Sequence, residues 1–118
     1  MVLIDTSAWV MYFRNGNIGL ETLLHEYRVV YHPFIVGEHA CGNLKNRAEI
    51  LSLLPALPMA IHGEHEEVMR FIEDHRLMGK GLGYIDIHLI ASALLTEVLL
   101  WTVDKKLNEI SIKLGINY

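Results

Sequence analysis

The chain has 118 residues, which is enough for one compact domain with a buried core and too few for two. Its hydrophobic content of 52% is high for a single domain, which indicates a sheet buried on both faces and apolar surface left over for a partner. The net charge of −4 argues against nucleic-acid binding through a broad basic face. No apolar run is long enough to cross a bilayer and the N-terminus lacks a secretory signal pattern, so we expect a cytoplasmic protein without membrane contact.

The first seven residues combine a short apolar run with one acid. Residues 2–4, Val-Leu-Ile, predict a short buried strand, and Asp5 follows it at the edge of a sheet. Either Thr6 or Ser7 is expected to cap the helix that comes next, which holds the Asp5 carboxylate near the positive end of the helix dipole. The sequence therefore predicts an anchored acid at the end of the first strand.

Strand-like and helix-like segments alternate along the rest of the chain. Apolar spacing and the positions of glycine and proline predict, in order, a helix over 8–13, a helix over 20–27, a strand over 29–31, helices over 34–44 and 48–54, a weak strand over 59–61, helices over 68–75 and 85–95, a strand over 98–102 and a helix over 107–114. Strands separated by helices pair in parallel through right-handed crossovers. The predicted fold class is α/β, a three-layer α/β/α sandwich with a central, mainly parallel sheet of four to five strands.

Four acids occupy unusual places in this pattern. Asp5 ends the first strand and Asp104 follows the last one, and ligands of such folds bind beyond the carboxyl ends of the strands. Asp86 begins the most apolar helix, and Glu38 interrupts an otherwise apolar helix face. Acids in apolar surroundings are costly to bury unless they are paired, protonated or bound to a cation.

A divalent cation is the partner that this pattern favours. No lysine or arginine lies within the apolar runs that carry Asp5, Glu38 and Asp86. Mg²⁺ and Mn²⁺ take oxygen ligands and use few carboxylates together with substrate phosphates, and such ions assist phosphodiester hydrolysis. The alternative treats the acids one at a time, Asp86 and Asp104 as helix caps and Glu38 as a solvated residue. Spacing alone leaves both interpretations open.

Four separated segments add a family resemblance to this interpretation. They are residues 2–7 (VLIDTS), 35–42 (IVGEHACG), 83–91 (GYIDIHLIA) and 100–104 (LWTVD). In this order and spacing they resemble the signature regions of PIN-domain ribonucleases, and most closely those of the VapC toxins of type II toxin–antitoxin modules. The resemblance spans nearly the whole chain. It implies a single PIN-like domain over residues 1–118 and a Mg²⁺-dependent endoribonuclease in which Mn²⁺ can replace Mg²⁺.

The resemblance also assigns roles to individual residues. It gives the metal-binding and catalytic roles to Asp5, Glu38, Asp86 and Asp104, with Asp5 and Asp86 as the principal ligands. Thr6 and Thr102 would hydrogen-bond to the carboxylates and orient them. One position departs from the family pattern, because Val103 stands where many relatives carry a basic residue that contacts RNA.

Partners follow from the same resemblance. VapC-like toxins are held inactive by a small VapB-type antitoxin whose C-terminal segment covers the acidic site, often with an arginine. They commonly form homodimers, which suits the surplus of apolar residues. The expected substrate is structured RNA, such as tRNA or rRNA, cut at a single-stranded loop. The candidates for phosphate contacts are Arg14, Lys45, Arg47, Lys80, Lys105 and Lys106.

Two other functions fit parts of the sequence. A phosphatase that forms an aspartyl-phosphate on Asp5 expects a second aspartate two positions on, where this chain has Ser7. A non-catalytic adaptor for RNA or protein would keep the acids as remnants.

The remaining chemistry-bearing residues receive structural interpretations. The run that contains His62, Glu64, His65 and Glu66 lacks the spacing of a zinc site. Cys41 is expected to be a buried thiol, and the scattered histidines are expected at the surface or in satisfied core positions, with His88 near the acidic pocket. Two tryptophans, Trp9 and Trp101, are expected to pack in the core.

Overall fold

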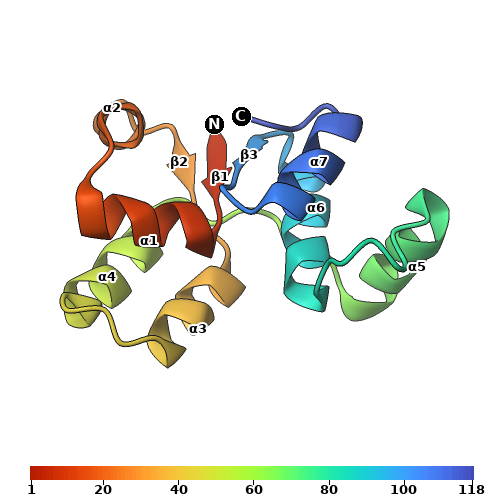
Figure 1. Cartoon of the computed structure of the whole chain (residues 1–118), viewed down its shortest axis with the longest axis horizontal. Coiled ribbons are helices and arrows are strands. Elements are labelled where there is room, and N and C mark those ends of the chain that lie inside the picture. Colours follow the sequence, from red (N-terminus) through yellow and green to blue (C-terminus); the bar gives the residue numbers. More distant parts are fainter.

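A computed structural model of the chain, which describes residues 1–118, has a parallel sheet flanked by helices (Figure 1). Its strands are β1 (Val2–Ile4), β2 (Val29–Val30) and β3 (Leu99–Trp101), in the order β2-β1-β3. All three residues of the central strand β1 are buried, which explains its uninterrupted aliphatic sequence. The α/β/α class predicted from the sequence is confirmed.

Helices connect the strands and cover both sides of the sheet. They are α1 (Thr6–Asn15), α2 (Ile18–His25), α3 (Pro33–Cys41), α4 (Arg47–Leu53), the short 3₁₀ helix η1 (Leu54–Ala56), α5 (His65–His75), α6 (Tyr84–Thr96) and α7 (Lys105–Lys113). Helices α1 to α4 lie on the β2 side of β1, and α5 to α7 lie on the β3 side (Figure 1). None of these helices has the length and apolar character needed to cross a membrane.

The sheet is slightly smaller than the four to five strands expected. Residues 59–61 form only one bridge, between Tyr31 and Met59, and the C-terminal Asn117 forms another with Leu100. The Tyr31 contact is limited to two hydrogen bonds, because Pro33 begins α3 two residues later and has no N–H to extend the ladder.

The start of α1 differs from the sequence prediction. The helix begins at Thr6, and its N-cap is Asp5, whose carboxylate accepts the backbone N–H of Ala8 at 3.0 Å. The expectation that Thr6 or Ser7 would be the cap was wrong. Aspartate is as good an N-cap as serine, so the acid at the strand end also fixes the following helix.

The core centres on α6, which crosses the molecule beside β3. Its residues 87–93 are all buried, as the nearly continuous apolar sequence predicted. Trp9 is fully buried and Trp101 packs against the core, so their predicted packing roles are confirmed. Cys41 is exposed, and the expectation of a buried thiol was wrong because α3 ends at this residue and Gly42 leads the chain away.

Candidate active site

The carboxylate of Asp5 lies at the carboxyl end of the central strand and is held by three hydrogen bonds. Its Oδ1 accepts from the N–H of Ala8 at 3.0 Å and from the hydroxyl of Ser7 at 2.6 Å, and its Oδ2 accepts from the hydroxyl of Thr102. Asp5 is only 5% exposed. Burial raises the pKa of this carboxyl above its usual value although the hydrogen bonds oppose the shift, and the negative charge of Asp86 raises it further.

Hydroxyl groups tie the end of β3 to the start of α1. The Thr102 oxygen accepts the N–H of Asp104 at 3.0 Å, and the Ser7 oxygen accepts the N–H of Val103 at 3.2 Å. The two hydroxyls lie 3.3 Å apart. Because both also donate to Asp5, the ends of β1 and β3 form one hydrogen-bonded unit around this acid.

The other three acids come from three different helices. Glu38 of α3 accepts the hydroxyl of Thr6 at 2.6 Å. Asp86 of α6 accepts the N–H of Gly83 at 3.0 Å, and Asp104 accepts the N–H of Leu107 at 2.9 Å as the N-cap of α7. Asp86 and Asp104 therefore accept hydrogen bonds at helix N-termini, as expected if each were only a helix cap.

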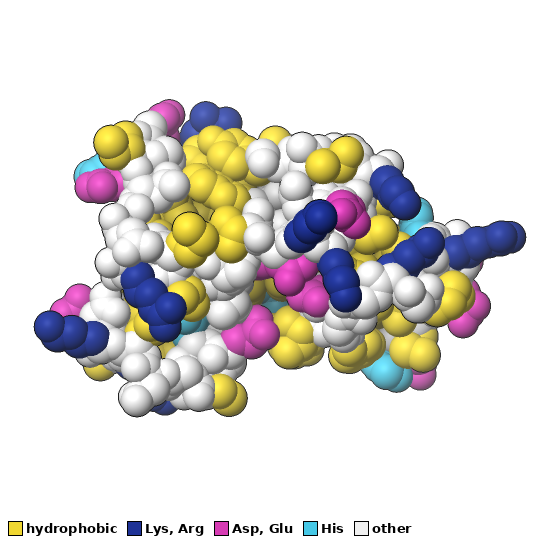
Figure 2. Space-filling view, viewed as in Figure 1, with side chains coloured by type: hydrophobic (Ala, Val, Ile, Leu, Met, Phe, Trp, Pro, Cys, Tyr) yellow, Lys and Arg dark blue, Asp and Glu magenta, His cyan; other side chains and the backbone are white.

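All four acids nevertheless line one cleft, here named the acidic cleft. Its volume is about 280 Å³, and its walls are formed by Asp5, Thr6, Ser7, Glu38, Asp86, Leu89 and Asp104. Figure 2 shows acidic side chains gathered at the middle of the molecule, between the two groups of helices, with basic side chains beside them. None of the four acids is in an ion pair, because the ion pairs of the chain join Glu21 to His25 and Glu26 to Arg28.

The donor chemistry of the acidic cleft fits a hard divalent cation. Its polar walls offer carboxylate and hydroxyl oxygens, which are the ligands that Mg²⁺ and Mn²⁺ prefer. No three histidine, cysteine, aspartate or glutamate side chains of the chain converge closely enough to hold an ion in this arrangement. The fit therefore lies in the kind of oxygen donors and in their uncompensated charge, and not in a closed set of ligands.

A cluster of three histidines, His32, His62 and His88, was not anticipated from the sequence. The ring of His32 lies 5.8 Å from that of His62 and 6.2 Å from that of His88, measured between centroids. His32 Nδ1 accepts the N–H of Phe34 at 3.0 Å, so the proton of the neutral ring is on Nε2, which has no partner. Burial lowers the pKa of His32 to about 4, and His62 and His88 contribute in the same direction.

These histidines were missed because they come from three separate segments with no motif spacing. The expectation that core histidines would be satisfied was wrong, since His32 Nε2, His39 Nε2 and His88 Nδ1 all lack a hydrogen-bond partner. The one local signal was the position of His32 directly before Pro33, where a helix N-cap stands. Burial also lowers the pKa of His39 and His88.

Some of the predicted phosphate contacts are engaged elsewhere. Arg47 donates to the carbonyl of Ala40 at 3.1 Å from Nε and 2.8 Å from Nη2, which holds the end of α3. The Lys106 side chain lies over Gly81, where an added Cβ would come within 2.7 Å of it. Lys105 and Lys106 open α7 directly after Asp104, so they remain closest in sequence to the acidic cleft.

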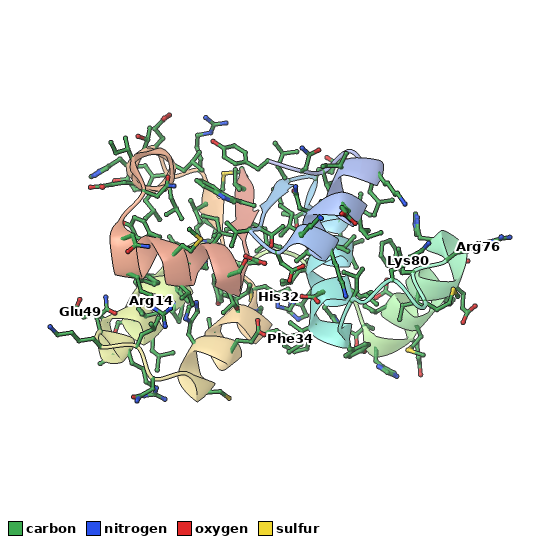
Figure 3. The ribbon with its side chains drawn as sticks, viewed as in Figure 1. Arg14, His32, Phe34, Glu49, Arg76 and Lys80 are labelled. Carbon is green, nitrogen blue, oxygen red and sulfur yellow. The ribbon has the colours of Figure 1, made fainter.

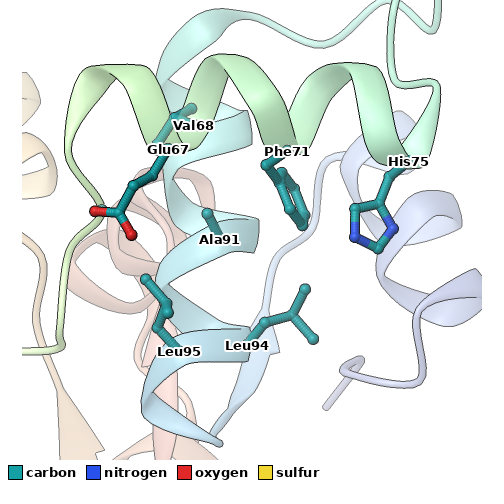
Figure 4. Close-up of a pocket in the computed structure, with 8 residues that line it drawn as sticks. Glu67, Val68, Phe71, His75, Ala91, Leu94 and Leu95 are labelled. Atoms are coloured by element: carbon teal, nitrogen blue, oxygen red, sulfur yellow. The ribbon is translucent and has the colours of Figure 1, made fainter.

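A second cavity of about 320 Å³ lies between α5 and α6 and has a different character (Figure 4). Its walls are mostly apolar, formed by Gly63, Glu67, Val68, Phe71, His75, Ala91, Leu94 and Leu95. It contains one acid, Glu67, which accepts the N–H of Glu64 at 3.0 Å in a capping box. It therefore lacks the gathered negative charge of the acidic cleft.

The fold and the acidic cleft together define a class: an α/β/α protein with carboxylates gathered at the carboxyl edge of a parallel sheet. In the comparison with family models, none matches this sequence. Curated relatives do: Ribonuclease VapC32 of Mycobacterium tuberculosis, from two strains, is 37% identical over 117 residues, covering 98% of this chain and 94% of the relative. The chain thus belongs to the family of VapC-type PIN-domain toxins, as its four motifs predicted.

A solved structure supports the fold. The crystal structure of PAE2754 from Pyrobaculum aerophilum aligns over 97% of this chain and 88% of that one, with a TM-score of 0.60 and 14% identity. At this identity the similarity concerns the fold alone. It is consistent with the three-layer arrangement around the short parallel sheet.

Proposed function

We propose that the protein is a Mg²⁺-dependent endoribonuclease that acts as the toxin of a VapBC-type module in the cytoplasm. Its substrate would be structured RNA, such as tRNA or rRNA, cut at a single-stranded loop. The observation that carries the proposal is the acidic cleft, in which four carboxylates from different elements meet without a compensating cation. The name of the relatives, ribonuclease, supports the same activity.

The residues of the acidic cleft would bind the metal or orient the residues that bind it. Asp5 and Asp86 would be the principal metal ligands, with Glu38 and Asp104 completing the site. A bound Mg²⁺ supplies an activated water and neutralises charge that develops on the phosphodiester. Thr102 fixes the orientation of Asp5 through a direct hydrogen bond. Thr6 does the same for Glu38, so both carboxylates are oriented before substrate arrives.

The cleft and the surface also suit the proposed protein partners. A VapB-type antitoxin that presents an arginine to the acidic cleft would find carboxylates that have no ion-pair partner of their own. A homodimer would cover apolar surface, and Figure 2 shows hydrophobic side chains gathered on the visible face. Exposed large apolar side chains include Met11, Ile18, Leu99 and Tyr118.

Sequencing of RNA ends after controlled expression tests the proposed activity. We expect new ends at a small number of loop positions with the wild-type protein and none with Asp5→Asn. Purified protein should reproduce these cuts with Mg²⁺ or Mn²⁺ and lose them with a chelator. RNA cleavage that persists in the purified Asp5→Asn protein would contradict the assignment of the site.

An adaptor without catalysis is the second candidate, and one observation favours it: no three side chains converge on an ion position. Calorimetric titration separates the two functions. Uptake of Mg²⁺ or Mn²⁺ by the wild type that is lost in Asp86→Asn supports the enzyme. The absence of uptake, together with the absence of RNA cleavage, would favour the adaptor.

A further inference from the structure

Two exposed aromatic rings, Phe34 and Tyr84, pack against the same buried imidazole ring. Phe34 is 38% exposed and Tyr84 is 41% exposed. Both rings meet the imidazole of His88 edge to face, with centroids 4.8 Å and 4.5 Å away and interplanar angles of 72° and 88°. His88 itself is only 4% exposed. The two rings are therefore supported by one ring that belongs to the core.

Further contacts hold each ring in place. Phe34 also packs on His32, with the centroids 4.9 Å apart, and Figure 3 shows this pair in the space between α3 and α6. The Tyr84 hydroxyl is hydrogen-bonded to His65 Nδ1, and the two rings lie 5.7 Å apart. An exposed ring that is already immobilised binds a flat ligand with little further loss of side-chain entropy.

Phe34 lines an open cavity that adjoins the acidic cleft. This cavity, here named the side cleft, has a volume of about 430 Å³ and is lined by Pro33, Phe34, Gly37, Glu38, Cys41 and Ile85. Glu38 lines both clefts, so the two clefts share this residue. Tyr84 directly precedes Ile85 at the start of α6.

Gly37 leaves the side cleft open where a side chain would fit. It lies in the middle of α3, where glycine is less favourable than alanine. A Cβ added at Gly37 would meet no atom within 4 Å, so no neighbour in the chain excludes a side chain. The space above Gly37 is part of the side cleft itself.

We propose that Phe34 and Gly37 form a binding site that stacks one unpaired nucleobase of the RNA next to the cleaved phosphate. This inference rests on the proposed ribonuclease function and adds to it the residues that hold the substrate. Bases in single strands expose both faces, and stacking on aromatic side chains holds them without requiring a particular sequence. The site therefore selects unpaired RNA over duplex.

The lining of the side cleft favours a base over the other parts of RNA. Its one charged residue is Glu38, whose carboxylate repels a phosphate unless a cation lies between them. The remaining walls are apolar or backbone, which suits the flat face of a base. The phosphate would then face the acidic cleft, where the proposed metal lies.

Binding and cleavage of a single-stranded oligonucleotide that spans a mapped cut site test this site. Binding is measured by fluorescence anisotropy in an Asp86→Asn background, and cleavage in the otherwise wild-type chain. We expect Phe34→Ala to weaken binding about tenfold, and Phe34→Trp, which keeps a stacking face, to restore it. Gly37→Leu should fill the side cleft and slow cleavage about tenfold while thermal stability is kept, because leucine favours a helix.

Abasic substitutions separate stacking from a general effect on folding. Oligonucleotides are made in which one base at a time is removed. Removal of the base at a single position next to the cut should weaken binding to the protein that retains Phe34 about tenfold, and removal elsewhere should not. At that position Phe34→Ala should cause no further loss, whereas at other positions it should. Tyr27→Ala serves as the control, because Tyr27 is 86% exposed and lies in the turn between α2 and β2.

The outcomes distinguish this inference from the function on which it rests. If the wild type cleaves RNA but Phe34→Ala and Gly37→Leu cleave and bind as well as the wild type does, the stacking site is wrong and the ribonuclease stands. If Phe34→Ala and an abasic substitution weaken binding independently at every position, the base does not stack on Phe34. If the wild type neither binds nor cleaves RNA, the proposed function and the stacking site both fall.

Discussion

The acidic cleft and the histidine cluster are two groups of titratable side chains that both draw residues from α3 with its N-cap and from α6, and they differ in their hydrogen bonding. Glu38 and His32 come from α3 and its N-cap, and Asp86 and His88 lie two residues apart on α6. The cleft acids accept hydrogen bonds from hydroxyl and N–H groups. In the cluster, His32 Nε2 and His88 Nδ1 are buried without a partner.

This difference shows how local hydrogen bonding decides what a titratable group does. Donors around a carboxylate stabilise its ionised form, so the cleft can hold negative charge for a cation or an arginine. An imidazole buried without a partner stays neutral and packs as an aromatic ring. The acids are therefore suited to chemistry, and the histidines to supporting Phe34 and Tyr84.

The largest expected effect concerns the charge of the acidic cleft. Asp86→Asn should lower the rate of RNA cleavage by on the order of 10³-fold, because a principal metal ligand is lost. Glu67→Gln is the matched control, since Glu67 is an acid in the apolar cavity between α5 and α6 and glutamine preserves the capping box (Figure 4). Equal losses of cleavage rate in the two variants, measured on one RNA substrate, would contradict the proposal that the acidic cleft, and not the cavity between α5 and α6, is the active site.

The histidine cluster should make the fold sensitive to acid. The pKa of His32 is about 4 in the folded chain, against 6.5 as its ordinary value, so the unfolded chain binds a proton that the native chain does not. Stability is then fully present above pH 6.5 and falls as the pH drops toward 4, by roughly 3 kcal/mol. Denaturant unfolding at several pH values measures this loss. His32→Asn keeps an N-cap without titrating, and an unchanged pH dependence in that variant would contradict the assignment.

A smaller effect is expected at the hydroxyl that holds Asp5. Thr102→Val preserves the shape of the side chain and removes its hydrogen bond to the buried carboxylate. The free energy of unfolding at neutral pH should fall by about 2 kcal/mol, as for other hydrogen bonds to charged groups. Thr22→Val is the control, because the Thr22 hydroxyl bonds to the Ile18 carbonyl on the surface. If Thr22→Val lowered the free energy of unfolding as much as Thr102→Val does, the hydrogen bond to Asp5 would contribute no more than a surface hydrogen bond.

The smallest effect should be a gain in stability. Burial raises the pKa of Asp5, which means that its ionised form is less favourable in the fold than in the unfolded chain. Asp5→Asn removes this charge and keeps an oxygen to cap α1, so the inactive protein should melt at a slightly higher temperature than the wild type. Thermal melts in the presence of a chelator measure this. A lower melting temperature would mean that the carboxylate stabilises the fold.

Much of the fold could be predicted from local patterns. The run at residues 2–4 could only be a buried strand, and the apolar segment that became α6 was too long for one. Boundaries were less predictable at Asp5, because a residue that ends a strand and caps a helix carries two signals at once. The strand over 59–61 was reduced to a bridge by the early start of α3, which only the pairing with Tyr31 reveals.

The acidic residues were predictable individually, because Asp5 and Asp104 follow apolar strands, Asp86 begins an apolar helix and Glu38 interrupts an apolar helix face. Their meeting in one cleft was expected only from the family resemblance, since it depends on where α3, α6 and α7 start relative to the strand ends. The histidine cluster and the aromatic pair left no signal in spacing. His32 and His88 become neighbours only when α3 packs beside α6, whereas Tyr84 and His88 lie four residues apart on one face of α6.

By itself, the amino-acid sequence determined the secondary-structure elements and the family. The hydrophobic periodicity, the residues that begin and end helices, and the four motifs are all local along the chain. Tertiary structure alone decided which polar groups are satisfied and which rings are exposed. The reason is that burial and hydrogen-bond partners depend on segments that are distant in sequence, as between Asp5 and Thr102 or between Phe34 and His88.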